Sequence, residues 1–281
     1  MLANMNDVLI DAQKNKYAVG LFNTIDTDAL EAAISAAEEL RSPIIIGTAE
    51  VLLPFAELQL IGPAMVNMAK NASVPVVVHY DHGLTFDRCM EALKLGFTSV
   101  MYDCSTDSYE DNIKRVKEMA EIAHSYGATI EGELGHVGDN EGSMEGDSHL
   151  EDPSKFYTDP MKAKEFVEKT GIDALAIAIG TAHGTYTCTP KLDIERLKQI
   201  RNTIDTPLVL HGGSGLPCED LKNCIVNGIA KINIFTDMCV AGEKAIKECS
   251  GDYHAIRAAK VNAIKNVVMS KMKQFGSDGR Y

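Results

Sequence analysis

The stretch PVVVHYDHG, residues 75–83, joins a continuous apolar run to a cluster of polar side chains. Such a run is typical of a parallel strand that is covered on both faces, and the polar cluster then lies at the carboxyl end of that strand. Similar runs recur along the chain, so the sequence predicts eight strands. The other seven are residues 18–23, 43–47, 98–103, 128–134, 173–180, 206–213 and 229–235.

Helical patterns fill the intervals between these runs. The clearest lie at residues 28–40, 85–96, 109–127 and 193–204, and several end on glycine, as helices often do. Eight strands that alternate with helices in a chain of 281 residues predict a (β/α)8 TIM barrel. An open doubly wound sheet is the alternative fold. It is disfavoured because no GxGxxG follows the first strand and because polar residues gather at many strand ends.

The whole chain, 1–281, is predicted to form a single barrel domain. One connection is unusually long: residues 135–160 are rich in glycine, acidic residues and serine, which predicts a mobile active-site loop, with a solvated insertion as the alternative. Residues 252–276 are expected to form one or two additional C-terminal helices. These helices would be amphipathic and would pack against the barrel or a second subunit.

The composition limits the function classes. No stretch approaches the roughly 20 apolar residues of a membrane helix, and the seven cysteines are scattered without a CxxC pair. We therefore expect a cytoplasmic protein without disulfides or a thiolate zinc site. A formal charge of −13 opposes binding to nucleic acid or to an anionic membrane surface. A phosphorylated substrate would need a local cradle of backbone N–H groups or cations.

Histidines follow three of the predicted strands. His82, His183 and His211 each precede a glycine at a strand end, so they could converge at the mouth of the barrel. Three neutral imidazoles with an open fourth position are the ligand set of a catalytic zinc ion. A single strand-end histidine more often only forms hydrogen bonds, but three of them together favour Zn²⁺. His79, which shares a strand face with Asp81, is expected to be packed and hydrogen-bonded instead.

Two glycine- or hydroxyl-containing segments offer an anion cradle. The segment HGGSG, residues 211–215, precedes a predicted helix, and residues 233–236 lie at the end of the eighth strand. Barrel enzymes frequently bind phosphate in the loops after the seventh and eighth strands. A glycine-rich turn alone is a weak signal, but here it adjoins a candidate metal ligand.

In order and spacing, five strings resemble those of class II fructose- and tagatose-bisphosphate aldolases. They are HYDHG (79–83), EGELGHVG (131–138), GTAHGTY (180–186), LHGGSG (210–215) and AKINIFT (230–236). The resemblance extends from about residue 5 to the final FGSDG. It implies a zinc-dependent lyase of carbohydrate metabolism, as in glycolysis. Such an enzyme reversibly cleaves fructose- or tagatose-1,6-bisphosphate to dihydroxyacetone phosphate and glyceraldehyde 3-phosphate.

The same resemblance implies roles for individual residues. Asp81 would exchange the proton of the C4 hydroxyl, Glu141 on the long loop would move a proton at C3, and Glu133 would support the zinc ligands or bind metal at an alternate site. Arg257 would reach the distal phosphate of a neighbouring subunit's substrate, which implies a homo-oligomer, a dimer or tetramer. The dihydroxyacetone phosphate moiety would bind, partly around a monovalent cation (Na⁺ or K⁺), to Gly184, Gly212, Gly213, Ser214, Asn233 and Thr236.

The chain also departs from the family pattern near the far end of the substrate. Tyr80 stands where leucine is usual, and the segment Gly47-Thr48-Ala49-Glu50 lacks the usual serine. A class II aldolase that acts on another phosphorylated ketose, with a different aldehyde product, is therefore the main alternative.

Two further alternatives concern the chemistry itself. Lys231 is the only lysine within a predicted strand, so it could serve a Schiff-base aldolase if it were desolvated. A non-catalytic phosphosugar-binding barrel would keep the cradle but would not need Asp81, His82 or Glu141.

Overall fold

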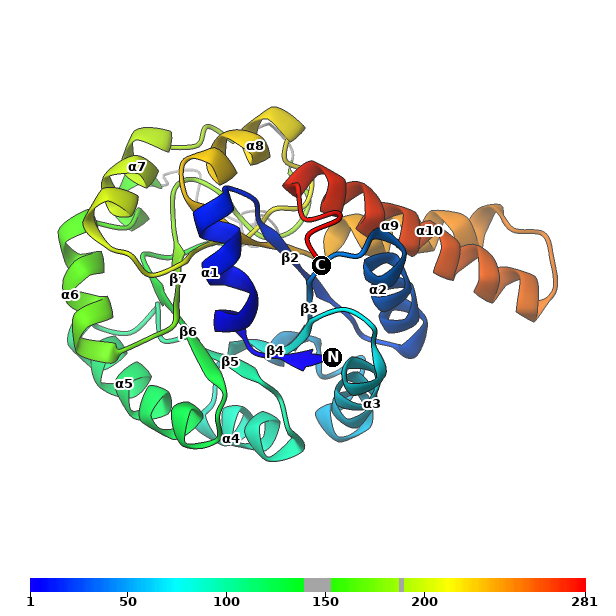
Figure 1. Cartoon of the computed structure of the whole chain (residues 1–281), viewed down its shortest axis with the longest axis horizontal. Helices are drawn as coiled ribbons and strands as arrows, with labels where there is room; N and C mark the ends of the chain where they lie inside the picture. Colours follow the sequence, from blue (N-terminus) through cyan, green and yellow to red (C-terminus); the bar gives the residue numbers. More distant parts are fainter. Residues whose placement is uncertain (139–152, 187–189) are drawn as a thin grey trace, which may run out of the picture.

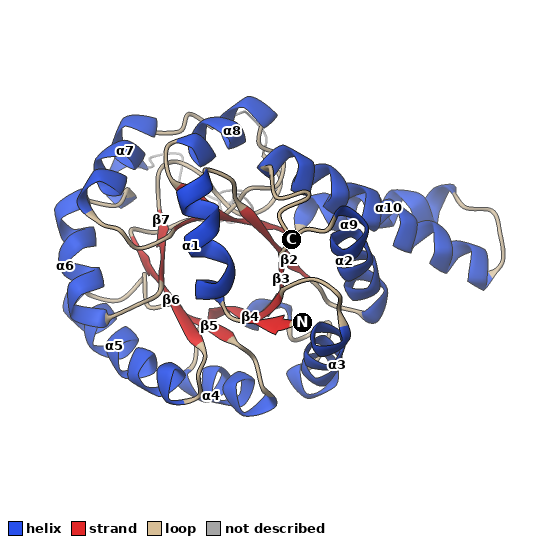
Figure 2. Cartoon of the chain, in the orientation of Figure 1, coloured by secondary structure: helices blue, strands red, loops and turns tan. Residues whose placement is uncertain are grey.

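The computed structural model describes residues 1–138, 153–186 and 190–281, and within them eight parallel strands close into a barrel surrounded by helices (Figures 1 and 2). The first barrel strand pairs with the last, and Tyr80 pairs with Val100, so the sheet has no open edge. All eight predicted strands and the TIM-barrel fold are confirmed. The strands are β2 Val19–Asn23, β3 Ile44–Ala49, β4 Val76–Gly83, β5 Ser99–Tyr102, β6 Thr129–Leu134, β7 Ala174–Ile177, β8 Leu208–Leu210 and β9 Ile229–Ile234.

Helices cover the outside of the barrel and match the four clearest predictions (Figure 2). Many begin at a side-chain cap; for example, Asp26 accepts a hydrogen bond from the amide of Ala29 at the start of α2. Those that surround the barrel between its strands are α2 Thr27–Leu40, α3 Leu58–Asn71, α4 Phe86–Leu95, α5 Tyr109–Ser125, α6 Pro160–Thr170, α7 Ile194–Thr203 and α8 Cys218–Val226.

One end of the barrel is closed by α1, Met5–Asn15, which lies across the opening in the centre of Figure 1. Its buried side chains Met5, Val8, Leu9 and Ala12 pack against apolar residues at the amino ends of the strands. The short strand β1, Leu2–Ala3, leads into α1 and pairs with β4. Because this end is filled, any site inside the barrel must open at the carboxyl ends of the strands.

Above this apolar layer, polar side chains occupy the barrel interior. Successive inward positions on a strand lie two residues apart. His79 and Asp81 on β4, Glu131 and Glu133 on β6, and Lys231 and Asn233 on β9 follow this spacing, and all six residues are buried. The interior therefore changes from apolar to charged toward the carboxyl ends.

The C-terminal segment forms one helix, α10 Tyr253–Phe275, after α9 Thr236–Glu248. Its buried residues, among them Val268, Met272 and Phe275, lie in its second half. Figure 1 shows the first half projecting beyond the barrel together with the end of α9. The sequence left open whether this segment forms one helix or two, and the structure shows one. None of the helices in the described ranges is both long enough and apolar enough to span a bilayer.

Candidate functional site

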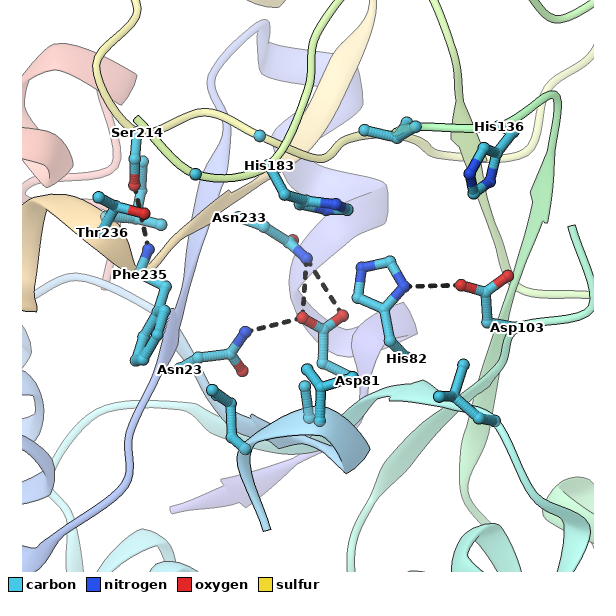
Figure 3. Close-up of a pocket in the computed structure, with 18 of the residues that line it drawn as sticks. Asn23, Asp81, His82, Asp103, His136, His183, Ser214, Asn233, Phe235 and Thr236 are labelled. Atoms are coloured by element: carbon cyan, nitrogen blue, oxygen red, sulfur yellow. Dashed lines mark hydrogen bonds and ion pairs between the residues drawn. The ribbon is translucent and has the colours of Figure 1, made fainter. Parts of the chain in front are cut away.

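A cavity of about 350 Å³ opens at the carboxyl ends of the strands (Figure 3). Asp81 and His82 lie beside each other in it, although neighbouring residues of a regular strand point to opposite faces. The pairing of β4 with β5 is irregular between Tyr80 and Gly83, and His82 has a left-handed backbone with φ of +42°. This irregularity turns both side chains toward the cavity. A strained residue of this kind costs about 1–3 kcal/mol and is typical of a functional site.

The three predicted histidine ligands come together at this mouth. Nitrogen atoms of His82, His183 and His211 lie within 4.8 Å of one another, although the residues follow three different strands. His82 Nε2 and His211 Nδ1 are 2.7 Å apart. Since the ring of His183 lies 4.9 Å from that of His82, the three rings surround one point.

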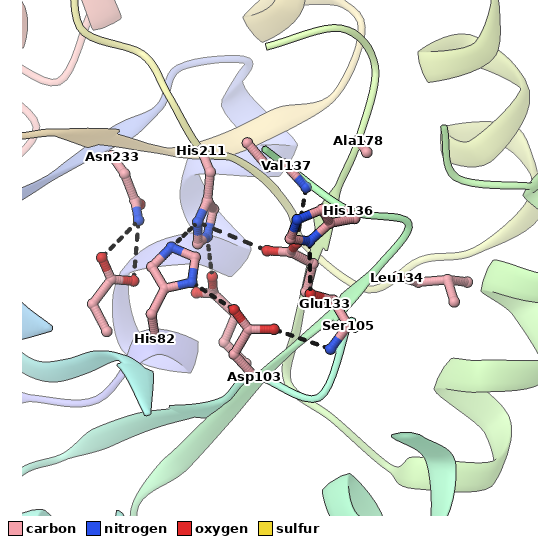
Figure 4. A network of polar contacts seen from close by, with 12 residues as sticks. His82, Asp103, Ser105, Glu133, Leu134, His136, Val137, Ala178, His211 and Asn233 are labelled. Atoms are coloured by element: carbon pink, nitrogen blue, oxygen red, sulfur yellow. Dashed lines mark hydrogen bonds and ion pairs between the residues drawn. The ribbon is translucent and has the colours of Figure 1, made fainter. Parts of the chain in front are cut away.

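The second nitrogen of two of these histidines is held by a carboxylate, as Figure 4 shows for His82 and Asp103. His82 Nδ1 lies 2.8 Å from Asp103 Oδ2, and His211 Nε2 lies 2.8 Å from Glu131 Oε1. A carboxylate behind each imidazole fixes the tautomer and orientation of a metal-binding histidine. The other nitrogens, His82 Nε2 and His211 Nδ1, face each other, so with His183 this donor set fits Zn²⁺, which binds three imidazoles and keeps one position open in catalytic sites.

The protonation states of the cluster are set by its own charges. Burial lowers the pKa of His82, but the charge of Asp81 and the hydrogen bond to Asp103 outweigh burial and raise this pKa to about 10. Burial, followed by the charge of His82, lowers the pKa of His183 to about 3. A metal binds only neutral imidazole, so a metal that binds this cluster must displace the proton of His82.

Asp81 is buried and held by two amides. Asn23 Nδ2 donates to one carboxylate oxygen at 2.8 Å, and Asn233 Nδ2 lies 3.1 Å from the other (Figure 3). Burial raises the pKa of Asp81, but the charge of His82 and the contact with His79 outweigh it and hold this pKa well below its usual range. Asp81 is therefore an ionised proton acceptor with a fixed orientation.

Glu133, predicted to support the ligands or to bind metal at an alternate site, lies close to the histidines. Its Oε2 is 3.9 Å from His211 Nδ1, and with His82 and Asp103 it forms a second group of potential ligands within 4.8 Å. Burial, followed by the charge of Asp103, raises the pKa of Glu133 to about 8. The geometry is thus compatible with both parts of the prediction, support of the ligands or an alternate metal position.

Lys231 does not fit a Schiff-base nucleophile. Its side chain is fully buried below the cavity, with Nζ 2.8 Å from Glu131 Oε2, and it does not line the cavity. His79 is likewise packed inside the barrel, with Nδ1 2.9 Å from Ser99 Oγ, as expected.

The predicted phosphate cradle lies on the β7–β9 side of the cavity. Five of its six residues line the cavity, namely Gly184, Gly212, Ser214, Asn233 and Thr236. Ser214 Oγ accepts a hydrogen bond from the amide of Phe235 at 3.1 Å, which leaves its hydroxyl proton free to be donated. The helix α9 begins here, and a helix N-terminus favours an anion. Gly213 does not line the cavity, and its amide donates to the carbonyl of Asn233.

Tyr186 joins the two loops that form this cradle. Its hydroxyl accepts from the amide of Ala182 and donates to the carbonyl of Gly212, each at 2.9 Å. Gly212 has φ of +66°, and a Cβ there would lie 2.3 Å from the carbonyl oxygen of Ala182. Only glycine allows the loops after β7 and β8 to approach this closely.

Two predicted residues are not in the described cavity. Glu141 lies outside the described residues, as does most of the loop predicted to be mobile. Arg257 lies in the second turn of α10, where it contacts Asp28 and Glu31 of α2.

Several site residues were missed from the sequence. Asp103 and Asn23 end their strands, so the strand-end rule could have found them. Glu131 lies two residues before Glu133, a spacing that predicts the same inward face. His136, which lines the cavity, had no signal beyond its place in the string EGELGHVG.

Known proteins resemble this chain over its full length. The family described as fructose-bisphosphate aldolase class-II matches residues 3–280. A fructose-bisphosphate aldolase of Geobacillus stearothermophilus is 38% identical over 293 aligned positions, which cover 99% of this chain and 98% of that protein. The protein YdjI of Escherichia coli K12 is 40% identical, and the alignment covers 100% of this chain and 99% of YdjI. The crystal structure of that YdjI aldolase superposes with a TM-score of 0.90 and 38% identity, covering 100% of this chain and 99% of the other.

Proposed function

Because this chain belongs to the class II fructose-bisphosphate aldolase family and is therefore an aldolase, a carbon–carbon lyase, we propose the following reaction. It cleaves a phosphorylated ketose between C3 and C4 and releases dihydroxyacetone phosphate and an aldehyde. Zn²⁺ is its cofactor, bound by His82, His183 and His211. The observation that carries this proposal is the convergence of three histidines beside the ionised carboxylate of Asp81.

The histidine cluster supports the metal assignment. Its carboxylate partners leave one nitrogen of His82 and one of His211 facing the cluster centre. When bound there, Zn²⁺ supplies a Lewis acid that polarises the ketose carbonyl and stabilises negative charge on its oxygen. The monovalent cation implied by the resemblance stays a prediction.

Asp81 is placed to move the first proton. Retro-aldol cleavage needs a base that takes the proton of the C4 hydroxyl as the C3–C4 bond breaks, and C4 then becomes the aldehyde carbon. The amides of Asn23 and Asn233 hold the carboxylate in one orientation, which favours proton transfer from a fixed direction. Glu141 is proposed to return a proton to C3, and this role stays a prediction.

The cradle orients the other end of the substrate. Gly184, Gly212, Ser214 and Thr236 would hold the phosphate of the dihydroxyacetone moiety, with Asn233 between this phosphate and Asp81. One anchored phosphate fixes the distance from C1 to the reacting carbons, which lowers the entropic cost of the reaction.

Fructose- and tagatose-1,6-bisphosphate remain the substrates implied by the resemblance, and another ketose phosphate is the second candidate. The non-catalytic alternative does not explain why an ionised Asp81 adjoins the metal-binding group. Cytoplasmic location and a homo-oligomeric state stay predictions.

The test is release of dihydroxyacetone phosphate from a panel of ketose phosphates. A chelator should abolish release and zinc should restore it. Asp81→Ala should lower kcat by about 10²–10⁴ while zinc remains bound, whereas Asp87→Ala, at an exposed carboxylate on α4, should leave kcat unchanged. Covalent trapping of Lys231 by borohydride, or full activity of zinc-loaded Asp81→Ala, would contradict the proposal.

A further inference from the structure

We propose that the aldehyde half of the substrate carries no phosphate, so that the enzyme cleaves a ketose 1-phosphate rather than a bisphosphate. This inference rests on the proposed function and specifies its substrate class. It follows from the side of the cavity opposite the cradle, which we call the acceptor side. Its residues come from the segments after β3, β4, β5 and β6: Ala49, Val51, Leu52, Leu84, Thr106, His136 and Val137.

The acceptor side is largely apolar and has no strong cation. Among the described residues, no lysine or arginine lines the cavity. The segments 139–152 and 187–189 contain no lysine or arginine in their sequence, and the first is strongly acidic. A phosphate dianion on this side would have to leave water for apolar side chains and nearby carboxylates, at a large cost in free energy.

The two nearby arginines are already engaged. Arg88 Nη1 lies 2.7 Å from Glu91 Oε2, and its Nη2 lies 3.5 Å from Glu57. Arg115 contacts Asp107 and lies over the ring of Tyr102. Neither arginine lines the cavity, so neither provides a phosphate site as the structure is arranged.

On the acceptor side, the position that would favour an anion is the start of α4, and the carboxylate of Glu50 already occupies it. At the start of α4, the amides of Leu84 and Thr85 donate to Glu50 Oε2 at 2.8 and 3.1 Å, and the hydroxyl of Thr85 donates to Oε1 at 2.9 Å. A helix N-terminus stabilises negative charge, and here that charge is a carboxylate. Glu50 therefore takes the interactions that a distal phosphate would use, and its charge repels a second anion.

Tyr80 adds to this arrangement. Its fully buried ring extends from β4 so that its hydroxyl reaches within 3.4 Å of Glu50 Oε2. Tyr80, which departs from the family pattern, thus interacts with the same carboxylate that occupies the start of α4.

The donor side shows what a phosphate site in this cavity looks like. The described residues that line it likewise include no lysine or arginine. Gly184 and Gly212 have positive φ, Ser214 and Thr236 provide hydroxyls, and the start of α9 is capped by no carboxylate, since the amide of Asp237 donates to Ser214 Oγ. Such a nest of amides binds an anion. The seven residues of the acceptor side include no glycine, and the start of α4 beside them is occupied by the carboxylate of Glu50.

Arg257 does not supply the missing charge within this chain. Its Nε lies 2.8 Å from Asp28 Oδ1, and its Nη2 lies 2.5 Å from Glu31 Oε2. To reach a neighbouring subunit's substrate, the guanidinium would have to leave both carboxylates. The charge pattern therefore favours an aldehyde product that is uncharged and ends in hydroxyl or apolar groups.

The test compares matched substrate pairs on zinc-loaded enzyme. Fructose 1-phosphate and fructose 1,6-bisphosphate, and the corresponding tagatose phosphates, are assayed for release of dihydroxyacetone phosphate. The reverse reaction pairs dihydroxyacetone phosphate with glyceraldehyde or glyceraldehyde 3-phosphate. We expect a higher kcat/KM for the monophosphate or the unphosphorylated aldehyde in each pair. A higher value for the bisphosphate overturns the inference alone, whereas no release of dihydroxyacetone phosphate from any of these pairs or from the wider ketose phosphate panel contradicts the proposed function.

Two variants test the charge argument directly. Glu50→Gln removes the charge, and Val51→Lys adds a cation at a side chain that is 62% exposed on the cavity rim. Each should raise the ratio of bisphosphate to monophosphate kcat/KM by about tenfold, or about 1.4 kcal/mol. Ile10→Lys adds the same charge to an exposed site on α1, at the other end of the barrel, and should leave the ratio unchanged. An unchanged ratio in folded Val51→Lys would refute the charge argument even if Glu50→Gln fails to fold.

Discussion

The ion pair between Glu131 and Lys231 gives the most direct test of how the barrel interior supports the site. Both side chains are 0% exposed, Lys231 Nζ lies 2.8 Å from Glu131 Oε2, and the other oxygen of Glu131 holds His211 at 2.8 Å. Glu131→Gln keeps the shape of the side chain but leaves the ammonium of Lys231 buried without a countercharge. Breaking a buried pair in this way costs about 3–5 kcal/mol. The variant should still fold, because domains of this kind are stable by about 5–15 kcal/mol.

The assay is urea unfolding followed by circular dichroism, with a chelator present so that metal binding does not contribute. The double variant Glu131→Gln/Lys231→Met should recover much of the loss, because no unpaired charge remains. Glu165→Gln removes a charge from the exposed pair with Lys169 and should not change the midpoint measurably. If Glu131→Gln unfolds at the same urea concentration as the wild type, the ion pair does not stabilise the barrel.

The same variant makes a prediction about pH. Burial raises the pKa of Glu131, but the charge of Lys231 and the hydrogen bond from His211 outweigh it and lower this pKa from 4.5 to about 2. A carboxylate whose pKa is lower in the folded state stabilises it above pH 4.5 and loses that contribution as the pH falls toward 2. The difference in unfolding free energy between the wild type and Glu131→Gln should therefore shrink over this range. A constant difference between pH 6 and pH 3 would refute the assignment.

Three further outcomes are expected from residues around the site. Asp103→Asn should weaken zinc binding about 10–100-fold in competition with a chromophoric chelator, because His82 loses its carboxylate partner; equal affinity would refute this role. Tyr186→Phe should lower the unfolding free energy by about 1 kcal/mol and raise KM for the ketose phosphate, because Ala182 and Gly212 lose their shared hydroxyl; an unchanged KM would exclude a part in shaping the cradle. Gly212→Ala should lower the thermal midpoint and activity far more than Gly279→Ala, which has a similar φ of +68° but open space around its Cβ, and equal effects would contradict the close approach of the loops.

The sequence by itself determined the barrel and which three histidines converge at its mouth. Continuous apolar runs at regular intervals predict parallel strands covered by helices, because this burial pattern follows directly from the order of residues. His82, His183 and His211 could be named because the carboxyl ends of parallel strands meet at one mouth, wherever the strands lie in the chain.

Only the tertiary structure decided which charged side chains pair inside the barrel and which residues line each side of the cavity. Glu131 and His211 are 80 residues apart in the chain, and Glu50 and Leu84 are 34 residues apart, so no local pattern connects them. Strand register and the irregularity of β4 bring them together and turn Asp81 and His82 into the same cavity. Hydrogen bonds and charge effects depend on distances of a few ångströms, and such distances between distant segments exist only once the barrel has closed.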